Sequence, residues 1–227
     1  MTGLPVAISF DLDGTLYSTR RVALRVLWAT RGRWRFLRIY RTVRQALRPR
    51  VFEDGDALHT AEVELLARAL VRDVETTREL LHRVHEVELV GALGRCGPDA
   101  LARPLILALH ARGVRLAVLS DLPVVAKLEA LGLADLPWTT VMDAGDTGAL
   151  KPHARPFERV AQALGVSVEQ LVHVGDRHDT DVTGAESCGA SAVWLTRKAD
   201  EPVARTTWTV RDLAELADRW ELALSPG

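Results

Sequence analysis

Cysteine is scarce in this chain, and no long hydrophobic run occurs in it. The two cysteines among the 227 residues, Cys96 and Cys188, lie far apart, with no Cys or His at metal-ligand spacing beside them. This excludes a disulfide framework, argues against a structural zinc site and favours a reducing, cytoplasmic setting. No stretch approaches the roughly 20 apolar residues of a membrane-spanning helix, so we expect no membrane span. The first residues also lack the basic lead and apolar run of a signal peptide.

The chain has no excess of charge of either sign. It carries 29 Lys and Arg against 30 Asp and Glu, which gives a formal net charge of −1. Such a balance argues against an attraction of the whole surface to nucleic acid or membrane, so we expect no nucleic-acid partner.

Short apolar runs typical of buried strands alternate with helix-like runs from about residue 104 onward. The strand-like runs, including one near the N-terminus, cover residues 6–10, 115–121, 139–143, 170–176 and 191–196. The helix-like runs cover residues 103–113, 123–133, 154–166, 181–190 and 210–220. This alternation predicts parallel βαβ units, hence an α/β fold with a Rossmann-like parallel sheet and helices on both faces.

Residues 18–100 break this rhythm. Apolar residues in 21–48 and 57–93 recur three and four positions apart, with no strand signal, which predicts helices. We therefore expect an all-helical insertion over 18–100, placed after the first strand of a core formed by 1–17 and 101–227. Two short runs, Tyr17–Arg20 and Arg95–Pro98, resemble hinges at its two ends.

Acidic residues follow several of the predicted strands. Asp11 and Asp13 end the first, Ser120 and Asp121 the second, and Asp176 the strand after residue 170. Ligands of open parallel sheets bind beyond the carboxyl ends of the strands. Carboxylates gathered there need a cation, and oxygen ligands suit Mg²⁺. Separate helix caps would explain any single aspartate, but not the whole set as well.

Four short motifs, in this order, carry a family resemblance. They are DLDGT at 11–15, LS at 119–120, LKP at 150–152 and GDRHDTD at 175–181. Together they resemble the haloacid dehalogenase superfamily of hydrolases, specifically its phosphatase branch, whose phosphoglycolate phosphatases are similar. The resemblance covers 6–17 and about 104–196. The insertion matches only in its position and helical character, where such enzymes carry a helical cap.

The resemblance implies a role for each matching residue. Asp11 would be the nucleophile that forms an aspartyl-phosphate, and Asp13 the general acid and base. Lys151 would neutralise charge around the nucleophile and the substrate phosphate. Asp11, the backbone carbonyl of Asp13 and Asp176 would hold Mg²⁺. Asp181 would support this site by orienting metal-bound water or Lys151, with Asp179 as a competing candidate.

Three further residues would lie at the substrate. Thr15 would hydrogen-bond within its loop and hold it, and Ser120 would donate to a phosphoryl oxygen. Asp121 stands where many relatives carry Asn, and would add negative charge near the phosphate. Gly14 would let the chain bend so that Asp13 returns over the same ligand.

These roles predict a Mg²⁺-dependent phosphatase that acts on a small phosphorylated metabolite. Two alternatives remain: a phosphomutase of the same superfamily, and a non-catalytic binding protein that uses an arginine-rich segment for an acidic partner or a membrane. That segment, residues 20–50, holds 11 Arg and no acidic residue, but the next stretch, 51–103, holds 11 Asp or Glu. We therefore favour arginines that are paired internally or solvated. The alternatives are a cap surface that attracts anionic substrates, and a contact with lipid or nucleic acid.

Two other features of the insertion are expected to be structural. Phe36, Tyr40 and Val43 fall, with Leu47, at the spacing of an ordinary helical core face. His82 and His85 are three residues apart without a third ligand, which favours a pair of surface side chains.

Overall fold

The structure is a computed structural model that describes residues 4–29, 33–196 and 207–224. Within those residues it contains one sheet of six strands: β1 (Ala7–Phe10), β2 (Arg115–Ser120), β3 (Thr140–Asp143), β4 (Leu171–Gly175), β5 (Ser191–Leu195) and β6 (Thr207–Val210). The strand order is β3-β2-β1-β4-β5-β6, and all neighbours are parallel. The α/β prediction with a parallel sheet is therefore confirmed.

Strand β1 lies in the middle of this sheet, between β2 and β4. Ser9 pairs with Ala117 on one side and His173 on the other. All four residues of β1 are buried, because helices cover both of its faces, and a strand of this kind is apolar throughout its length. The chain leaves β1 toward β2 on one side and later returns to β4 on the other, so β1 lies at the topological switch point of the sheet.

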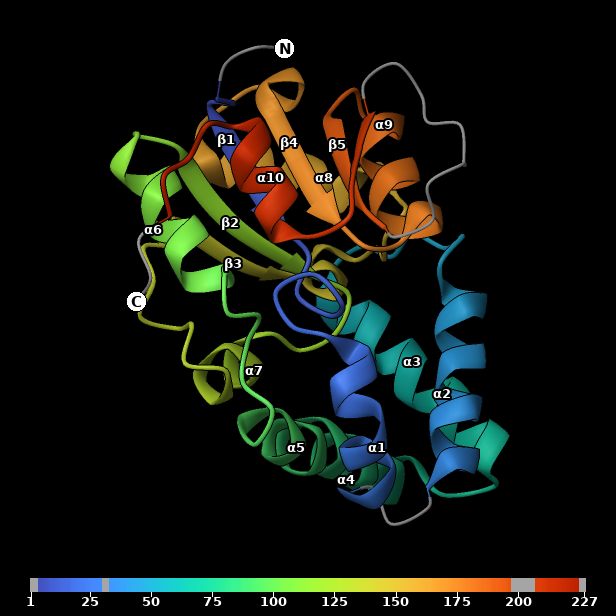
Figure 1. Ribbon diagram of the computed structural model, residues 1–227. Coiled ribbons are helices and arrows are strands. Elements are labelled where there is room, and N and C mark those ends of the chain that lie inside the picture. Colours follow the sequence, from blue (N-terminus) through green and yellow to red (C-terminus); the bar gives the residue numbers. More distant parts are fainter. Residues whose placement is uncertain (1–3, 30–32, 197–206, 225–227) are drawn as a thin grey trace.

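Helices cover both faces of the sheet (Figure 1). On one face lie α6 (Ala102–Ala111) and α10 (Leu213–Arg219), whose apolar side chains pack with those of Ile8 and Val174. On the other lie α8 (Ala154–Leu164) and α9 (Thr183–Ser187). The remaining helices of the core are α7 (Val125–Ala130) and the short turns η2 (Ala144–Thr147), η3 (Val168–Gln170) and η4 (His178–Val182).

The last strand differs from the sequence prediction. Strand β6 was not expected, and the last helix was predicted to begin at residue 210, which is the final residue of that strand. The helix begins instead at Leu213, because the Asp212 carboxylate accepts a hydrogen bond from the Glu215 backbone N–H at 3.0 Å and caps it.

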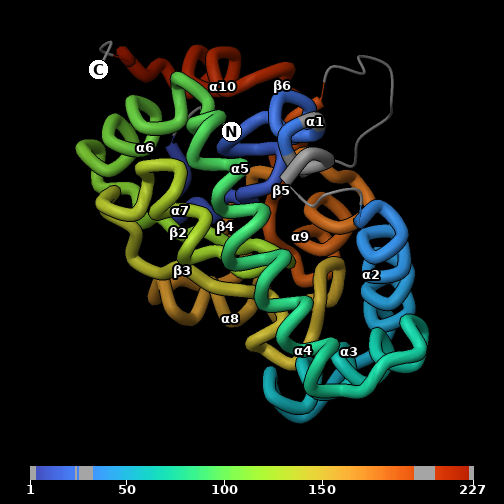
Figure 2. Tube along the Cα trace, turned by 90° about the horizontal axis from the view of Figure 1, so that it is seen from below, coloured from blue at the N-terminus to red at the C-terminus, as the bar shows by residue number. Residues whose placement is uncertain are grey.

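The helical insertion lies beyond the carboxyl ends of the strands (Figures 1 and 2). It contains α1 (Thr19–Ala29), α2 (Trp34–Leu47), α3 (Gly55–Leu70), α4 (Val74–His82), η1 (Arg83–Leu89) and α5 (Val90–Gly94). Phe36, Tyr40, Val43 and Leu47 of α2 are buried in an apolar cluster with residues of α3. The predicted core face of this helix is confirmed.

The prediction that His82 and His85 form a surface pair was wrong. His82 is exposed, but His85 is only 4% exposed and packs edge to face on Tyr40, with ring centroids 5.0 Å apart. His85 lies in η1, a π-helical turn. A π turn winds less tightly than an α turn, so residues three apart no longer share a face.

The connection between α2 and α3 is joined to the core. Val51 forms an isolated antiparallel bridge with Ala149, and the Phe52 N–H donates to the Gly148 carbonyl at 2.8 Å. These contacts hold the far end of α2 close to Lys151. Across the described residues, no helix has the length and apolar character needed to cross a membrane.

Candidate active site

Asp11 lies directly after β1, where its backbone N–H donates to the Val174 carbonyl of β4 at 2.8 Å. The chain then turns sharply at Gly14, whose φ is +100°. A Cβ atom at Gly14 would lie 2.2 Å from Oδ2 of Asp176. Glycine is needed here because both this φ and the close approach of the two loops exclude a side chain.

Lys151 joins two of the acids. Its Nζ donates to Oδ1 of Asp11 at 2.7 Å, to Oδ1 of Asp181 at 2.6 Å and to the Leu119 carbonyl at 3.2 Å. Burial by itself would lower the pKa of Lys151, but the two carboxylates outweigh it and raise the pKa above its usual range. The ammonium group therefore stays charged beside Asp11.

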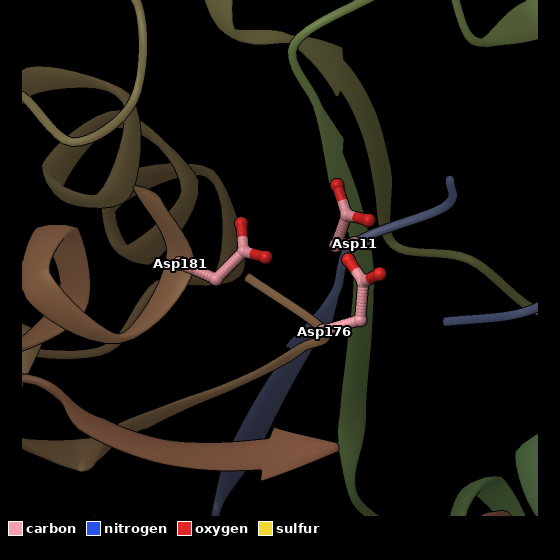
Figure 3. A group of neighbouring side chains, drawn as sticks. All are labelled: Asp11, Asp176 and Asp181. Atoms are coloured by element: carbon pink, nitrogen blue, oxygen red, sulfur yellow. The ribbon is translucent and has the colours of Figure 1, made fainter. Parts of the chain in front are cut away.

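Three carboxylates, which Figure 3 shows, lie close together near this lysine. Asp11, Asp176 and Asp181 each offer an oxygen, and the three oxygens lie within 4.8 Å of one another. Burial and the neighbouring acids raise the pKa of Asp11 well above its usual range, and burial raises that of Asp176 to about 6. Oδ1 of Asp176 is buried without a hydrogen-bond partner among the described residues. These features fit a bound divalent cation, which would stabilise both ionised carboxylates.

Asp181 differs from the other two because both of its oxygens are taken. Oδ1 accepts from Lys151, and Oδ2 accepts from the Arg177 backbone N–H at 3.0 Å. Although burial opposes it, Lys151 lowers the pKa of Asp181. Asp179 is exposed and paired with the Arg177 side chain at 2.6 Å. The structure thus brings Asp181, and not Asp179, to the acidic group. The carboxylates left to bind a cation are Asp176 and Asp11, of which Asp11 shares Oδ1 with Lys151.

The side chain of Asp13 lies apart from this group and has its own cation. Nζ of Lys127 donates to both carboxylate oxygens, each at 2.8 Å, and Tyr17 and Ser120 also donate to them. Burial alone would raise the pKa of Asp13, but the contact with Lys127 and these hydrogen bonds lower it below its usual range. The ionised carboxylate is therefore the favoured form.

Sequence reasoning missed Lys127. It is only 2% exposed and lies in α7, far along the chain from Asp13. A usable signal was present, because the chain holds three lysines against 26 arginines. The rarity of lysine that draws attention to Lys151 applies equally to Lys127.

The three residues expected at the substrate have different surroundings. The Ser120 hydroxyl donates to Asp13 at 3.2 Å and accepts from the Leu122 N–H at 3.2 Å. The hydrogen bond expected of Thr15 within its loop does not come from the hydroxyl, because Oγ1 is buried without a partner among the described residues. Backbone hydrogen bonds close the loop instead, from Thr15 and Leu16 to the Leu12 carbonyl.

Asp121 contacts the insertion. Its Oδ2 pairs with the guanidinium of Arg48 at 2.7 Å, and its Oδ1 accepts from the Lys151 backbone N–H at 3.1 Å. The extra negative charge expected at this position is therefore balanced by an arginine of the insertion.

A cavity of about 250 Å³ opens over these residues. Asp11, Asp13 and Lys151 line it from the core, and Arg41 and Arg48 line it from the segment that contains α2. The site thus combines Asp11, a buried carboxylate next to a lysine, with the ionised carboxylate of Asp13 and with the Asp176 carboxylate, which can bind a cation together with Asp11. This set can attack, bind and stabilise a phosphoryl group.

The chain matches the haloacid dehalogenase-like hydrolases over residues 6–189. Because this match spans most of the chain, the protein belongs to that family of hydrolases.

The relatives found among known proteins include phosphatases. A phosphoglycolate phosphatase of Rhodospirillum rubrum is 34% identical over 213 residues, which cover 88% of this chain and 84% of that protein. The 5-amino-6-(5-phospho-D-ribitylamino)uracil phosphatase YigB of Escherichia coli is 30% identical and matches 92% of this chain and 90% of its own. A phosphoserine phosphatase of Thermus thermophilus is 37% identical, but over only 52% of this chain and 45% of that protein.

Solved structures share the fold at low identity. The hydrolase YfnB of Bacillus subtilis superposes with a TM-score of 0.67 at 18% identity, covering 96% of this chain and 99% of that one. The L-2-haloacid dehalogenase of Xanthobacter autotrophicus gives 0.66 at 20% identity, covering 95% and 98%.

Proposed function

We propose that this hydrolase is a Mg²⁺-dependent phosphatase that releases phosphate from a small phosphorylated metabolite through an aspartyl-phosphate on Asp11. The observation that carries the proposal is the position of Asp11: it directly follows β1, lines the cavity, accepts a hydrogen bond from Lys151 and has an oxygen within 4.8 Å of one of Asp176. Relatives that match most of the chain are phosphatases.

The first step uses Asp11 and Asp13. A carboxylate oxygen of Asp11 attacks phosphorus, and the ester P–O bond breaks as the new P–O bond forms. The leaving oxygen takes a proton from the Asp13 carboxyl group. The incoming phosphate is negatively charged, so its approach raises the pKa of Asp13 and favours the protonated form that this step needs.

The second step returns Asp11 to its starting state. Asp13, now ionised, accepts a proton from water, and the resulting hydroxide attacks phosphorus and displaces the Asp11 carboxylate as phosphate leaves. Lys127 favours this ionised form of Asp13. Lys151 keeps positive charge beside the transferring group in both steps.

The metal would be held by the Asp11 and Asp176 carboxylates and the Asp13 backbone carbonyl. When bound, Mg²⁺ would supply positive charge for the two carboxylates and the phosphoryl oxygens. Residues 18–100 would act as a cap that excludes water from the first step. The cytoplasmic setting stays a prediction from the two cysteines, which are both free.

The test is hydrolysis of p-nitrophenyl phosphate with Mg²⁺, with and without EDTA. We expect EDTA to stop the release of inorganic phosphate and added Mg²⁺ to restore it.

Asp11→Asn should lower kcat by about a thousandfold or more because the amide is a poor nucleophile, while circular dichroism stays unchanged. Asp218→Asn, the same change at an exposed site on α10, is the matched control. Turnover that is indifferent to EDTA, or an active Asp11→Asn variant, would contradict the proposal. With a sugar phosphate in place of p-nitrophenyl phosphate, a product isomer without free phosphate would indicate a phosphomutase.

A further inference from the structure

The wall that α2 and the residue after it contribute to the cavity carries positive charge and no negative charge. Arg41, Arg44 and Arg48 line the cavity with Gln45 and Tyr40, whereas every acidic side chain of the lining belongs to the core. The five residues recur at spacings of three and four, so they share one helical face. A cationic wall opposite the phosphoryl site favours a ligand with more than one negative group.

Two of the three arginines are already paired. Arg44 is buried, forms an ion pair with Glu62 at 2.7 Å and donates to the Asp121 carbonyl. Arg48 pairs with the Asp121 carboxylate and donates to the Lys151 carbonyl. Both hold α2 against the core, and their charge is balanced by acids of the protein.

Arg41 has no such partner. It is exposed, and its guanidinium makes no hydrogen bond or ion pair with any described residue, although it lines the same cavity as Asp11 and Asp13. The remaining lining cations, Lys151 and Arg177, are both paired with acids. Within the described part of the chain, Arg41 is therefore the lining cation whose charge is available to a ligand.

The position of Arg41 limits the ligand. It lies seven residues before Arg48, which is about 10 Å along a helix axis, and Arg48 contacts Lys151 at the phosphoryl end. A ligand that reaches Arg41 must carry its second charge several bonds from the phosphorus. A cavity of about 250 Å³ also restricts it to a small molecule.

We infer that Arg41, assisted by the amide of Gln45, binds a second anionic group of the substrate. The preferred substrates are then phosphate monoesters whose leaving group itself carries a carboxylate or a second phosphate. This inference rests on the proposed function, because it assigns the binding of a second anionic group to the far end of the same cavity.

The experiment compares matched esters. In the first pair, 3-phosphoglycerate carries a carboxylate where glycerol 3-phosphate carries an alcohol. In the second pair, fructose 1,6-bisphosphate carries a phosphate that fructose 1-phosphate lacks. The two pairs distinguish a carboxylate from a second phosphate. We expect kcat/KM to be at least about tenfold higher for the member with the second anionic group in one of the pairs, which is the effect of one charge-assisted contact.

Variants test whether the preference for a second anionic group depends on Arg41. Arg41→Met should remove it by lowering kcat/KM about tenfold more for the ester with the second anionic group than for the ester without it, and Arg41→Lys should restore part of it. Most of the loss should appear in KM, because the contact is remote from the reacting atoms. Arg38→Met is the matched control, since Arg38 is exposed on the same helix and does not line the cavity.

A second readout does not depend on turnover. Calorimetric binding of the same esters to Asp11→Asn, with and without Arg41→Met, should show the same preference. Equal affinity within both pairs, or a preference that survives Arg41→Met, would overturn the inference while leaving phosphatase activity intact. Absence of any Mg²⁺-dependent hydrolysis would overturn the proposed function instead, and the binding comparison would still decide the role of Arg41.

Discussion

At the scale of single residues, burial sets the chemistry of this protein. His85 of η1 is buried against Tyr40, and neither ring nitrogen has a partner among the described residues. Burial, with the nearby positive charges of Lys127 and Arg44, lowers its pKa to about 3, against the weaker opposing effect of Asp13. The ring is therefore neutral in the folded protein at every physiological pH.

This shift predicts how stability depends on pH. In the unfolded chain a histidine takes up a proton below about pH 6.5, whereas folded His85 does so only near its pKa of about 3. The contribution of neutral His85 to the stability of the fold is therefore complete above the pKa of histidine in the unfolded chain, and it is lost as the pH falls below that value. The free energy of unfolding of His85→Leu, taken relative to that of wild type, should therefore rise by up to about 3 kcal/mol between about pH 7.5 and about pH 4.

Urea unfolding of both proteins at the two pH values measures this change. His82→Leu is the matched control, because His82 is exposed three residues earlier. If the free energies of unfolding of His85→Leu and wild type differ by the same amount at both pH values, the assignment of a buried, neutral ring is refuted.

The roles of single residues were predictable only in part. Asp11, Asp176 and Lys151 follow strands or a short motif, and parallel strands bring their ends together whatever the loops do. The pairing of Lys127 with Asp13 depends instead on how α7 packs, and joins residues 114 positions apart. No local pattern reports such a contact.

At the scale of elements, α2 is the segment that couples the insertion to the site. Its buried face packs in the insertion, while Arg44 and Arg48 reach the loop after β2. The arginine-rich segment is thus partly paired, as expected, but its partners include Asp121 of the core as well as Glu62 of α3.

The Arg48–Asp121 contact should hold the two parts together. Both side chains are mostly buried, at 17% and 15% exposure, so water screens their attraction less than at the surface. A double-mutant cycle of Arg48→Met and Asp121→Asn, read by urea unfolding, should give a coupling free energy of at least about 1 kcal/mol. The exposed pair Arg68–Glu64 on α3, 4.0 Å apart, is the control and should give at most about 0.5 kcal/mol. Equal values for the two cycles would refute a docking role for Arg48.

The elements themselves were more predictable than their contacts. Strands β1, β2 and β4 are covered on both faces, so each is a continuous apolar run that stands out in the sequence. Strand β6 lies at the edge of the sheet and consists of Thr207–Val210, whose short TWTV sequence has no such run. The π turn η1 could not be predicted from the sequence either, because its apolar residues have the spacing of an ordinary α-helix.

At the scale of the whole molecule, the insertion is joined to the core by more than its two chain connections. The chain enters and leaves it through Tyr17–Arg20 and Arg95–Pro98, which the sequence suggests as hinges. The α2–α3 connection forms a third contact, through the bridge between Val51 and Ala149. If the insertion acts as a cap, it can move away from the cavity only when this bridge separates.

Cross-linking that bridge should therefore trap the closed form. Paired residues of antiparallel bridges have Cα atoms about 4.5–5.5 Å apart, which suits a disulfide. In a background with Cys96 and Cys188 replaced by alanine, oxidised Val51→Cys/Ala149→Cys should lose at least about tenfold in kcat/KM for p-nitrophenyl phosphate, because substrate entry requires opening. Dithiothreitol should restore the rate, and neither single cysteine variant should respond to oxidant. A fully cross-linked enzyme with undiminished kcat/KM would mean that substrate reaches Asp11 without this movement.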